Sequence, residues 1–245
     1  MVLEFLAEFI HANPFIGIVL FSVIISLFIT LIIFFFTDKE KMRALKERQK
    51  ELQRKAKEHQ KNGNQEGLLE INKQMMMEMP EMMKHNLKPM LITFIPIIII
   101  FSWANANIAY LPIAPQQEFV VVVGLVTGSV GEVNISVSEE INVIGNKLKT
   151  IQNNQVNWTL KGNAGTHFLK FTYNGDLASK KVIITEGVEY EKVSEKYDGE
   201  IKIITIKNEK LVCMNLLGWK VGWLGSYIIF SLIFSLVFRK LFKMP

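Results

Sequence analysis

Cysteine is almost missing from this chain of 245 residues, which contains only Cys213. One cysteine cannot form an internal disulfide, and it cannot supply the clusters that most cysteine-based metal sites need. Histidine is nearly as scarce, and the four histidines lie in separate segments without a carboxylate placed as a metal or triad partner: His11, His59, His85 and His167. The sequence motifs of serine hydrolases, zinc proteases and nucleotide-binding loops are also absent. We therefore expect no enzyme activity, no bound metal and no cofactor.

Charged residues are missing from three long apolar segments. The first, 15–36, has 22 residues without a charge, and the others are 90–111 and 221–238. About 20 apolar residues cross the hydrocarbon core of a bilayer. No Lys or Arg precedes the first segment and no small-residue cleavage site follows it, so we interpret it as an anchor and not as a cleaved signal peptide. The sequence predicts three transmembrane helices, at 15–37, 89–111 and 216–239.

Basic residues are missing from the first 14 positions but are common elsewhere. Residues 38–88 carry 13 Lys or Arg, and the end of the chain adds Arg239, Lys240 and Lys243. Because cytosolic loops are rich in Lys and Arg, we expect 38–88 and the tail at 240–245 to be cytosolic. The N-terminus and the segment after the second span are then extracellular, in a multi-pass protein of the plasma membrane. This topology explains the basic charge, so we expect no sequence-specific nucleic-acid binding.

Two helical segments flank the first predicted span. Residues 1–14 place Glu4, Glu8 and His11 on one side of a helix, which predicts an amphipathic helix lying in the membrane interface. Residues 38–88 are charged and favour helix, with a weak heptad pattern and an Asn-Gly-Asn turn near the middle. Both ends of this segment meet the membrane. It is therefore predicted to form an antiparallel helical hairpin with coiled-coil character.

Residues 112–215 contain short alternating apolar segments separated by turns that contain Gly and Asn. A spacing of about ten residues is typical of a β-sandwich, here with about seven strands. Glycosylation motifs at Asn134 and Asn157 suit an extracellular location. The predicted fold class is an α-helical membrane protein with three transmembrane helices, the N-terminus outside and the C-terminus inside. It also has a cytosolic helical hairpin and an inserted extracellular all-β sandwich domain.

Polar residues recur at helical spacing inside the predicted spans. Hydroxyl groups four residues apart form one stripe on the first span and another on the third, and the second span adds Thr93. If they converge, they line a hydrophilic groove within the bilayer; the alternative is that each hydroxyl bonds to a carbonyl of its own helix or joins two helices. The candidate groove residues are Ser22, Ser26, Thr30, Thr93, Tyr227, Ser231 and Ser235. Three further polar residues lie at the outer end of the second span, where interfacial water can hydrate them: Ser102, Asn105 and Asn107.

Methionine is concentrated just before the second span. A helix places five of these side chains on one side, and flexible thioether side chains adapt to many hydrophobic partners. This pattern predicts capture of hydrophobic segments; the alternative is that the methionines pack the hairpin internally. The candidate capture residues are Met75, Met76, Met79, Met82 and Met83.

Several sequence segments together resemble the archaeal YidC-like proteins of the Oxa/YidC superfamily, which includes the third subunit of the endoplasmic reticulum membrane protein complex. The matching segments are TDKEKMR at 37–43, KPM at 88–90, GWLGSY at 222–227 and RKL at 239–241. The resemblance covers residues 1–111 and 216–245 and implies a membrane insertase with a groove open to the cytosol. Bacterial members place an arginine inside the first span, whereas this sequence has positive charge only at the groove mouth. The mouth residues are Lys39, Lys41, Arg43 and Lys88.

The resemblance and the polar and methionine patterns predict a membrane protein insertase or chaperone. It would capture hydrophobic segments of nascent proteins and pass them through the groove into the bilayer without nucleotide hydrolysis. The implied partners are nascent membrane proteins and the lipid bilayer, with the ribosome as a further candidate. Two other functions are an ion channel or lipid-moving protein that uses the same groove, and an adhesion module formed by the β-domain.

Overall fold

The computed structural model describes residues 2–244, apart from the side chains of Val2, Lys39, Met82, His85, Asn86, Lys88 and Pro89. The chain divides into two compact units. The β-unit comprises Met1–Ile18 and Ser102–Ser226, and the helical unit comprises Val19–Phe101 and Tyr227–Pro245.

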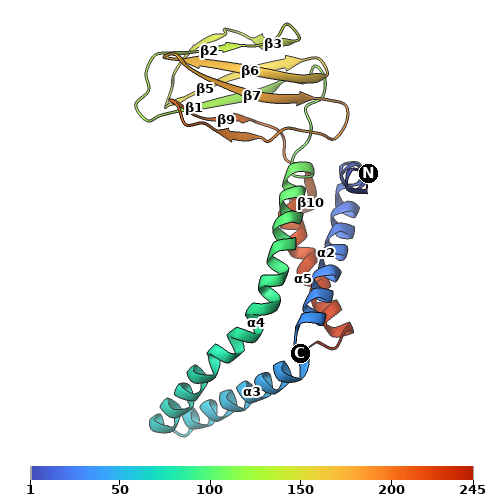
Figure 1. Ribbon diagram of the computed structural model, residues 1–245, viewed down its shortest axis with the longest axis vertical. Helices are drawn as coiled ribbons and strands as arrows, with labels where there is room; N and C mark the ends of the chain where they lie inside the picture. The colour runs from blue at the N-terminus through green and yellow to red at the C-terminus, as the bar shows by residue number, and fades with distance from the viewer. Residues whose placement is uncertain (1, 245) are drawn as a thin grey trace. The chain divides into compact units, whose positions relative to one another are not determined.

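Five helices occur in the described chain (Figure 1). They are α1 (Val2–Ala12), α2 (Pro14–Phe36), α3 (Lys39–Lys61), α4 (Gln65–Asn107) and α5 (Trp223–Leu241). Three stretches are long and apolar enough to cross a membrane: Pro14–Phe36, Met90–Asn107 and Trp223–Leu241. The prediction of three membrane helices is therefore confirmed.

Local sequence signals produce the turn between α3 and α4. The Asp38 side chain accepts a hydrogen bond from the Lys41 N–H at 3.1 Å and caps the start of α3. Gly63 adopts a φ of 66°, a conformation that glycine takes without steric cost. Asn64 then caps α4 by accepting a hydrogen bond from the Gly67 N–H at 2.9 Å. Capped ends on both sides of a short turn direct the two helices into a hairpin.

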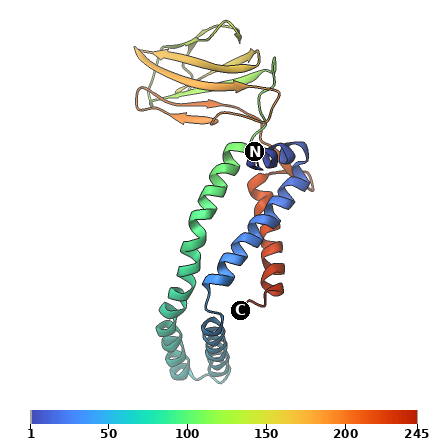
Figure 2. The ribbon, with the colours of Figure 1, turned by 45° about the vertical axis from the view of Figure 1, so that its right-hand side comes forward.

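Apolar contacts and ion pairs hold α3 against the first half of α4. Met42, Leu52 and Ile71 are buried in the hairpin. Arg48 pairs with Glu78 at 3.2 Å across the two helices. The predicted antiparallel hairpin is present, and Figure 2 shows its two helices side by side.

Helix α4 continues without interruption from the hairpin into the second span. The sequence predicted two separate elements here, a hairpin that ends at residue 88 and a span that reaches residue 111. The structure instead has one helix of 43 residues that passes through Pro80, Pro89 and Pro96 and ends at Asn107. Each proline removes only one backbone hydrogen bond, and the remaining ladder keeps the segment helical. Figure 1 shows α4 curving along its length.

The first helix folds back against the beginning of α2. Ala7 and Ile10 of α1 are buried, and a side chain at Gly17 would collide with the backbone of Ile10. His11 is half-buried, whereas Glu4 and Glu8 are exposed. The His11 Nε2 lies 2.9 Å from the Asn107 carbonyl oxygen at the end of α4. A polar tertiary contact therefore joins the end of α1 to the end of α4.

Two antiparallel sheets form most of the β-unit. The five-stranded sheet has the order β3-β5-β1-β9-β8 and the four-stranded sheet the order β4-β2-β6-β7. The strands of the first are β1 (Phe119–Leu125), β3 (Ile141–Ile144), β5 (Gln155–Gly162), β8 (Ser194–Lys196) and β9 (Ile201–Ile206). Those of the second are β2 (Glu132–Ser136), β4 (Leu148–Thr150), β6 (Gly165–Tyr173) and β7 (Asp176–Ile184). The prediction of antiparallel β-structure is confirmed, but the short strands β3, β4 and β8 were not foreseen because they are too short to show alternation.

One hydrophobic core lies between the two sheets. Strand β6 alternates buried and exposed residues, with Leu169 and Phe171 turned inward. Trp158 of β5 meets Phe171 with ring centroids 5.4 Å apart, so the core joins both sheets. The indole N–H of Trp158 donates to the Lys147 carbonyl oxygen at 3.1 Å, which satisfies its one polar atom.

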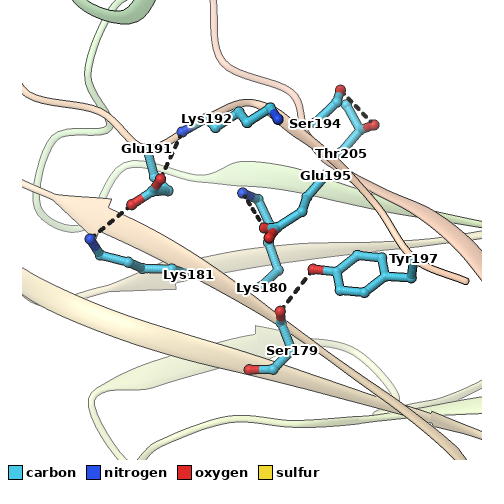
Figure 3. Close-up of polar contacts among 9 residues, drawn as sticks. All are labelled: Ser179, Lys180, Lys181, Glu191, Lys192, Ser194, Glu195, Tyr197 and Thr205. Carbon is cyan, nitrogen blue, oxygen red and sulfur yellow. Dashed lines mark hydrogen bonds and ion pairs between the residues drawn. The ribbon is translucent and has the colours of Figure 1, made fainter.

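Polar side chains connect β7 of one sheet with β8 of the other (Figure 3). The Lys180 side chain is fully buried, and its Nζ lies 3.1 Å from Oε2 of Glu195. A buried ammonium group needs such a partner, because burial without one is very costly. The Tyr197 hydroxyl donates to the Ser179 carbonyl oxygen at 2.8 Å nearby. These contacts tie the edges of the two sheets together.

A β-hairpin replaces the predicted beginning of the third span. Residues 216–239 were expected to be helical, but β10 (Val212–Leu216) and β11 (Trp219–Gly222) pair antiparallel and α5 begins only at Trp223. Gly218 lies in the hairpin turn with a φ of 92°. The third span is apolar both as predicted and as observed. The glycine in the turn and the pairing of β10 with β11 make its predicted beginning a β-hairpin instead of a helix.

Candidate functional site

The hydroxyl stripe of α2 lies on the buried side of this helix. Ser22, Ser26 and Thr30 have exposed fractions of 0%, 4% and 2%. Apolar residues on the other side of α2 are exposed: Leu20, Ile24 and Phe28. The most hydrophobic helix of the chain therefore turns its few polar side chains towards the protein. A larger share of α2 than of the other two candidate spans is buried inside the protein.

Tyr227 joins the three spans within the helical unit. Its ring lies 6.0 Å from that of Phe21 in α2 and 5.2 Å from that of Phe101 in α4. Further along α5, Ser231 and Ser235 are half-buried. The structure thus buries the α2 stripe and Tyr227, whereas the two serines of α5 remain partly exposed. Phe21 and Phe101 were missed by sequence reasoning because a sequence contains no signal for the register between two helices.

Three of the candidate hydroxyls donate to a carbonyl of their own helix. Thr30 Oγ1 donates to the Ser26 carbonyl oxygen at 2.6 Å, Thr93 Oγ1 to the Met90 carbonyl oxygen at 2.9 Å, and Ser231 Oγ to the Ile228 carbonyl oxygen at 3.1 Å. These bonds are the alternative that the sequence left open. Each hydroxyl oxygen still retains lone pairs that can accept a hydrogen bond.

Ser26 differs from these hydroxyls because its donor is not used. Its Oγ is buried and has no hydrogen-bond partner within residues 2–244. A buried hydroxyl without a partner costs about 1–3 kcal/mol, so such groups are rare unless they have a use. The centre of the α2 stripe therefore offers both a donor and an acceptor.

Most of the methionine cluster faces solvent and does not fill the hairpin. Met76, Met79 and Met83 have exposed fractions of 71%, 55% and 55%, whereas Met75 is half-buried. The side chain of Met82 lies outside the described residues. The hairpin interior is filled by other residues, so the internal-packing alternative does not account for these three exposed methionines.

An exposed apolar stripe extends from these methionines along α4 into the second span. Its residues recur in steps of three and four, which places them on one helix face. The members are Met76, Met79, Met83, Leu87, Met90, Phe94 and Ile98, all of them exposed. We call this set the α4 stripe. An open groove of about 750 Å³ adjoins it, lined in part by Pro80, Leu87 and Leu91. The stripe exists only because α4 is continuous, which is why the sequence prediction of two elements missed it.

The charged residues predicted at the groove mouth are partly engaged with other groups. Lys41 pairs with Glu81 at 3.5 Å, and the Arg43 guanidinium donates to the Lys243 carbonyl oxygen at 3.2 Å. The side chains of Lys39 and Lys88 lie outside the described residues. Lys41 therefore has an acidic neighbour that reduces its pull on a client carboxylate.

The polar residues at the far end of α4 have separate roles. The Asn107 amide donates to the Trp103 carbonyl oxygen at 2.8 Å, while Ser102 and Asn105 are exposed beside an open pocket of about 610 Å³. The Tyr190 hydroxyl donates to the Asn105 carbonyl oxygen at 2.9 Å and accepts from the Ala109 N–H at 2.9 Å, and so clamps the end of the helix. Burial raises the pKa of Tyr190 to about 12, which keeps the phenol protonated near neutral pH.

The predicted glycosylation residues are exposed on strands. Asn134 lies on β2 and Asn157 on β5, each with neighbours on both sides that are buried. Within the described residues no group of three or more His, Cys, Asp or Glu side chains could hold a metal ion.

Three candidate membrane helices, with a helical hairpin between the first and second, fit an integral membrane protein of the Oxa1/YidC superfamily. A family model described as integral membrane protein EMC3/TMCO1-like matches residues 1–138. Because this match covers more than half of the chain, the protein belongs to the EMC3/TMCO1-like family. Members of that family are insertases and not enzymes. No curated protein and no solved structure matches the chain.

Proposed function

We propose that this protein captures hydrophobic segments of nascent proteins on the α4 stripe and passes them along the hydroxyl-bearing side of α2 into the bilayer. The α4 stripe carries this proposal. It is apolar and exposed over the whole distance from the hairpin to the middle of the second span. A hydrophobic client can therefore move from the hairpin to the membrane without leaving an apolar surface.

Methionine suits the first part of this path. Its unbranched, polarizable side chain adapts to clients of different shape, whereas β-branched side chains are stiff. The α4 stripe changes from Met76, Met79 and Met83 in the hairpin to Phe94 and Ile98 in the span. The methionines of the hairpin would thus bind clients with little selectivity, and the residues of the span would then offer them a surface that resembles lipid.

The hydroxyl stripe suits the polar part of a client. A polar flank that crosses bare hydrocarbon loses its hydration at a cost of several kcal/mol for each unpaired group. Ser26 offers a free donor and Thr30 an acceptor, which replace part of that hydration and lower the barrier. The final partition of an apolar segment into lipid is downhill, so the reaction needs no nucleotide.

The positive-inside rule supports a cytosolic location for the hairpin and an extracellular location for the β-unit, in the plasma membrane. In this topology the α4 stripe begins in the compartment where ribosomes deliver nascent chains. The same compartment makes the ribosome an expected partner.

An ion channel is the alternative use of the same helices. A conducting path needs a series of free polar groups, but three of the hydroxyls are already bonded to their own helices. Ser26 has an unused donor, but the next hydroxyl of this stripe, Thr30, donates to the Ser26 carbonyl oxygen. We therefore favour insertion over conduction.

Site-specific photocrosslinking to stalled nascent chains tests the proposal. A crosslinker at Met76 or Ser26 is expected to capture a client with an exposed transmembrane segment. Met77 is the matched control, because its exposed fraction of 72% is close to the 71% of Met76 but it lies about 100° around the helix. Equal crosslinking from Met76 and Met77, or crosslinks from Ser26 to lipid alone, would contradict the proposal. Ion flux through liposomes without client insertion would favour the channel.

A further inference from the structure

The turn of the β10–β11 hairpin carries apolar side chains that contact little of the chain. We call residues 216–219 the hairpin tip. Leu216, Leu217 and Trp219 have exposed fractions of 47%, 102% and 73%. Leu217 therefore gains nothing from packing within the protein.

The backbone conformation of the hairpin tip makes leucine energetically unfavourable at position 217. Leu217 has a φ of 51° and Gly218 a φ of 92°, and the two residues form the turn between the strands. Two-residue turns with positive φ at both positions strongly favour Asn-Gly, because a branched apolar side chain is strained there. The Asn215 side chain accepts a hydrogen bond from the Gly218 N–H at 3.0 Å, which helps to hold the turn. A leucine that is both strained and fully exposed indicates a partner outside the chain.

The hairpin is attached at both ends to the ends of membrane helices. Before β10, the Leu211 N–H donates to the Ala109 carbonyl oxygen at 3.1 Å, two residues beyond the end of α4. After β11, α5 begins at Trp223 without a connecting loop. Six residues at about 3.3 Å each keep Leu217 within about 20 Å of the first turn of α5.

We propose that the hairpin tip inserts into the lipid leaflet on the side of the membrane where the β-unit lies. Leu216 and Leu217 would enter the acyl region, while Trp219 and Lys220 would lie at the headgroups, where Trp and basic side chains are typically found. Lipid is the occupant that the attachment favours, because one end of the hairpin continues into α5 and the other is hydrogen-bonded to Ala109, just beyond the end of α4. This inference does not depend on insertase activity.

An environment-sensitive fluorophore tests the position of the tip in the full-length protein. Cys213 is first replaced by Ser, and nitrobenzoxadiazole is attached to Leu217→Cys in nanodiscs that hold one copy each. Emission is expected to shift to shorter wavelength and to be quenched by lipids with shallow nitroxide groups. Val130→Cys is the matched control, because Val130 is an apolar residue with an exposed fraction of 80% in the loop after β1, and its emission should stay water-like.

Water-like emission from position 217 would overturn the proposal, as would equal lipid quenching at positions 217 and 130. A blue shift that occurs only when nanodiscs hold two copies would also overturn it, because the tip would then be covered by a second copy. A second variant separates lipid contact from folding. Leu217→Asn suits the turn better, so hairpin folding should be kept while quenching of a fluorophore at Leu216→Cys falls. Unchanged quenching in this variant would count against insertion by Leu217.

Discussion

Ser26 combines a structural cost with a chemical use. Its hydroxyl is buried on α2 without a partner in the described chain, whereas the neighbouring Thr30 is bonded to the Ser26 carbonyl oxygen. A fold optimised for stability alone would place an apolar residue at this position. Under the proposed function the unused donor serves a polar group of the client during its passage.

Ser26→Ala is expected to raise the free energy of unfolding by about 1 kcal/mol, because it removes a buried unsatisfied hydroxyl. The same change should slow client insertion by about fivefold, the effect of losing one hydrogen bond worth about 1 kcal/mol from the barrier. Thermal unfolding in detergent and insertion into liposomes measure the two effects. Thr30→Val is the matched control: it removes a satisfied bond and should lower stability instead. A Ser26→Ala variant that inserts clients normally would contradict a role for this hydroxyl.

Tyr190 is expected to lose its phenol proton at a higher pH than an ordinary tyrosine does. Its pKa is raised from 10.0 to about 12 by burial, so the folded protein holds the phenol proton more tightly than the unfolded chain does. Its contribution to stability is therefore complete below pH 10 and is lost as pH rises from 10 towards 12. The tyrosinate absorbance of the wild type minus that of Tyr190→Phe should have its midpoint near pH 12. A titration midpoint near pH 10 would show that Tyr190 is exposed to solvent and does not hold the end of α4.

At the scale of elements, the continuity of α4 is the main result. One helix connects the hairpin with the membrane, so the exposed methionines and the lipid-facing residues share one side. Replacing Met76, Met79 and Met83 together by Ser should strongly reduce crosslinking of clients to the hairpin, because about 0.8 kcal/mol is lost for each CH₂ no longer buried. Stability should change little, since these side chains are exposed.

The control for this triple variant is Met77→Ser, an exposed apolar residue of the same helix that lies about 100° around the helix from Met76. This change should leave client crosslinking intact. If both variants lose clients equally, general hydrophobicity and not the stripe is responsible. Circular dichroism of each variant checks that the hairpin still folds.

The sequence predicted α3, the turn and the three spans because these elements depend on local signals. Runs of apolar residues, Asp38 and the Asn-Gly-Asn turn act over a few positions. The β10–β11 hairpin and the continuation of α4 through three prolines were missed. A segment such as 216–222 is apolar enough for a span, and only its pairing with β10 shows that it is a strand.

At the scale of the whole molecule, topology decides which compartment each unit meets. We expect the hairpin and the β-unit on opposite sides of the membrane. In intact cells, a membrane-impermeant maleimide should label Val130→Cys but not Leu69→Cys, each made in a Cys213→Ser background. Both positions are exposed in the structure, so accessibility within the protein does not differ. Labelling of Leu69→Cys alone would reverse the orientation and place the α4 stripe away from the ribosome.

The sequence alone determined the number of spans, the position of the hairpin and the presence of hydroxyl stripes, because hydrophobicity, charge and helical spacing are properties of neighbouring residues. Tertiary structure decided which hydroxyls are bonded, which aromatic rings meet Tyr227 and how far the exposed stripe of α4 extends. It also decided that a strained leucine projects from the turn before α5. These features depend on contacts between segments far apart in the chain, and packing alone sets their register.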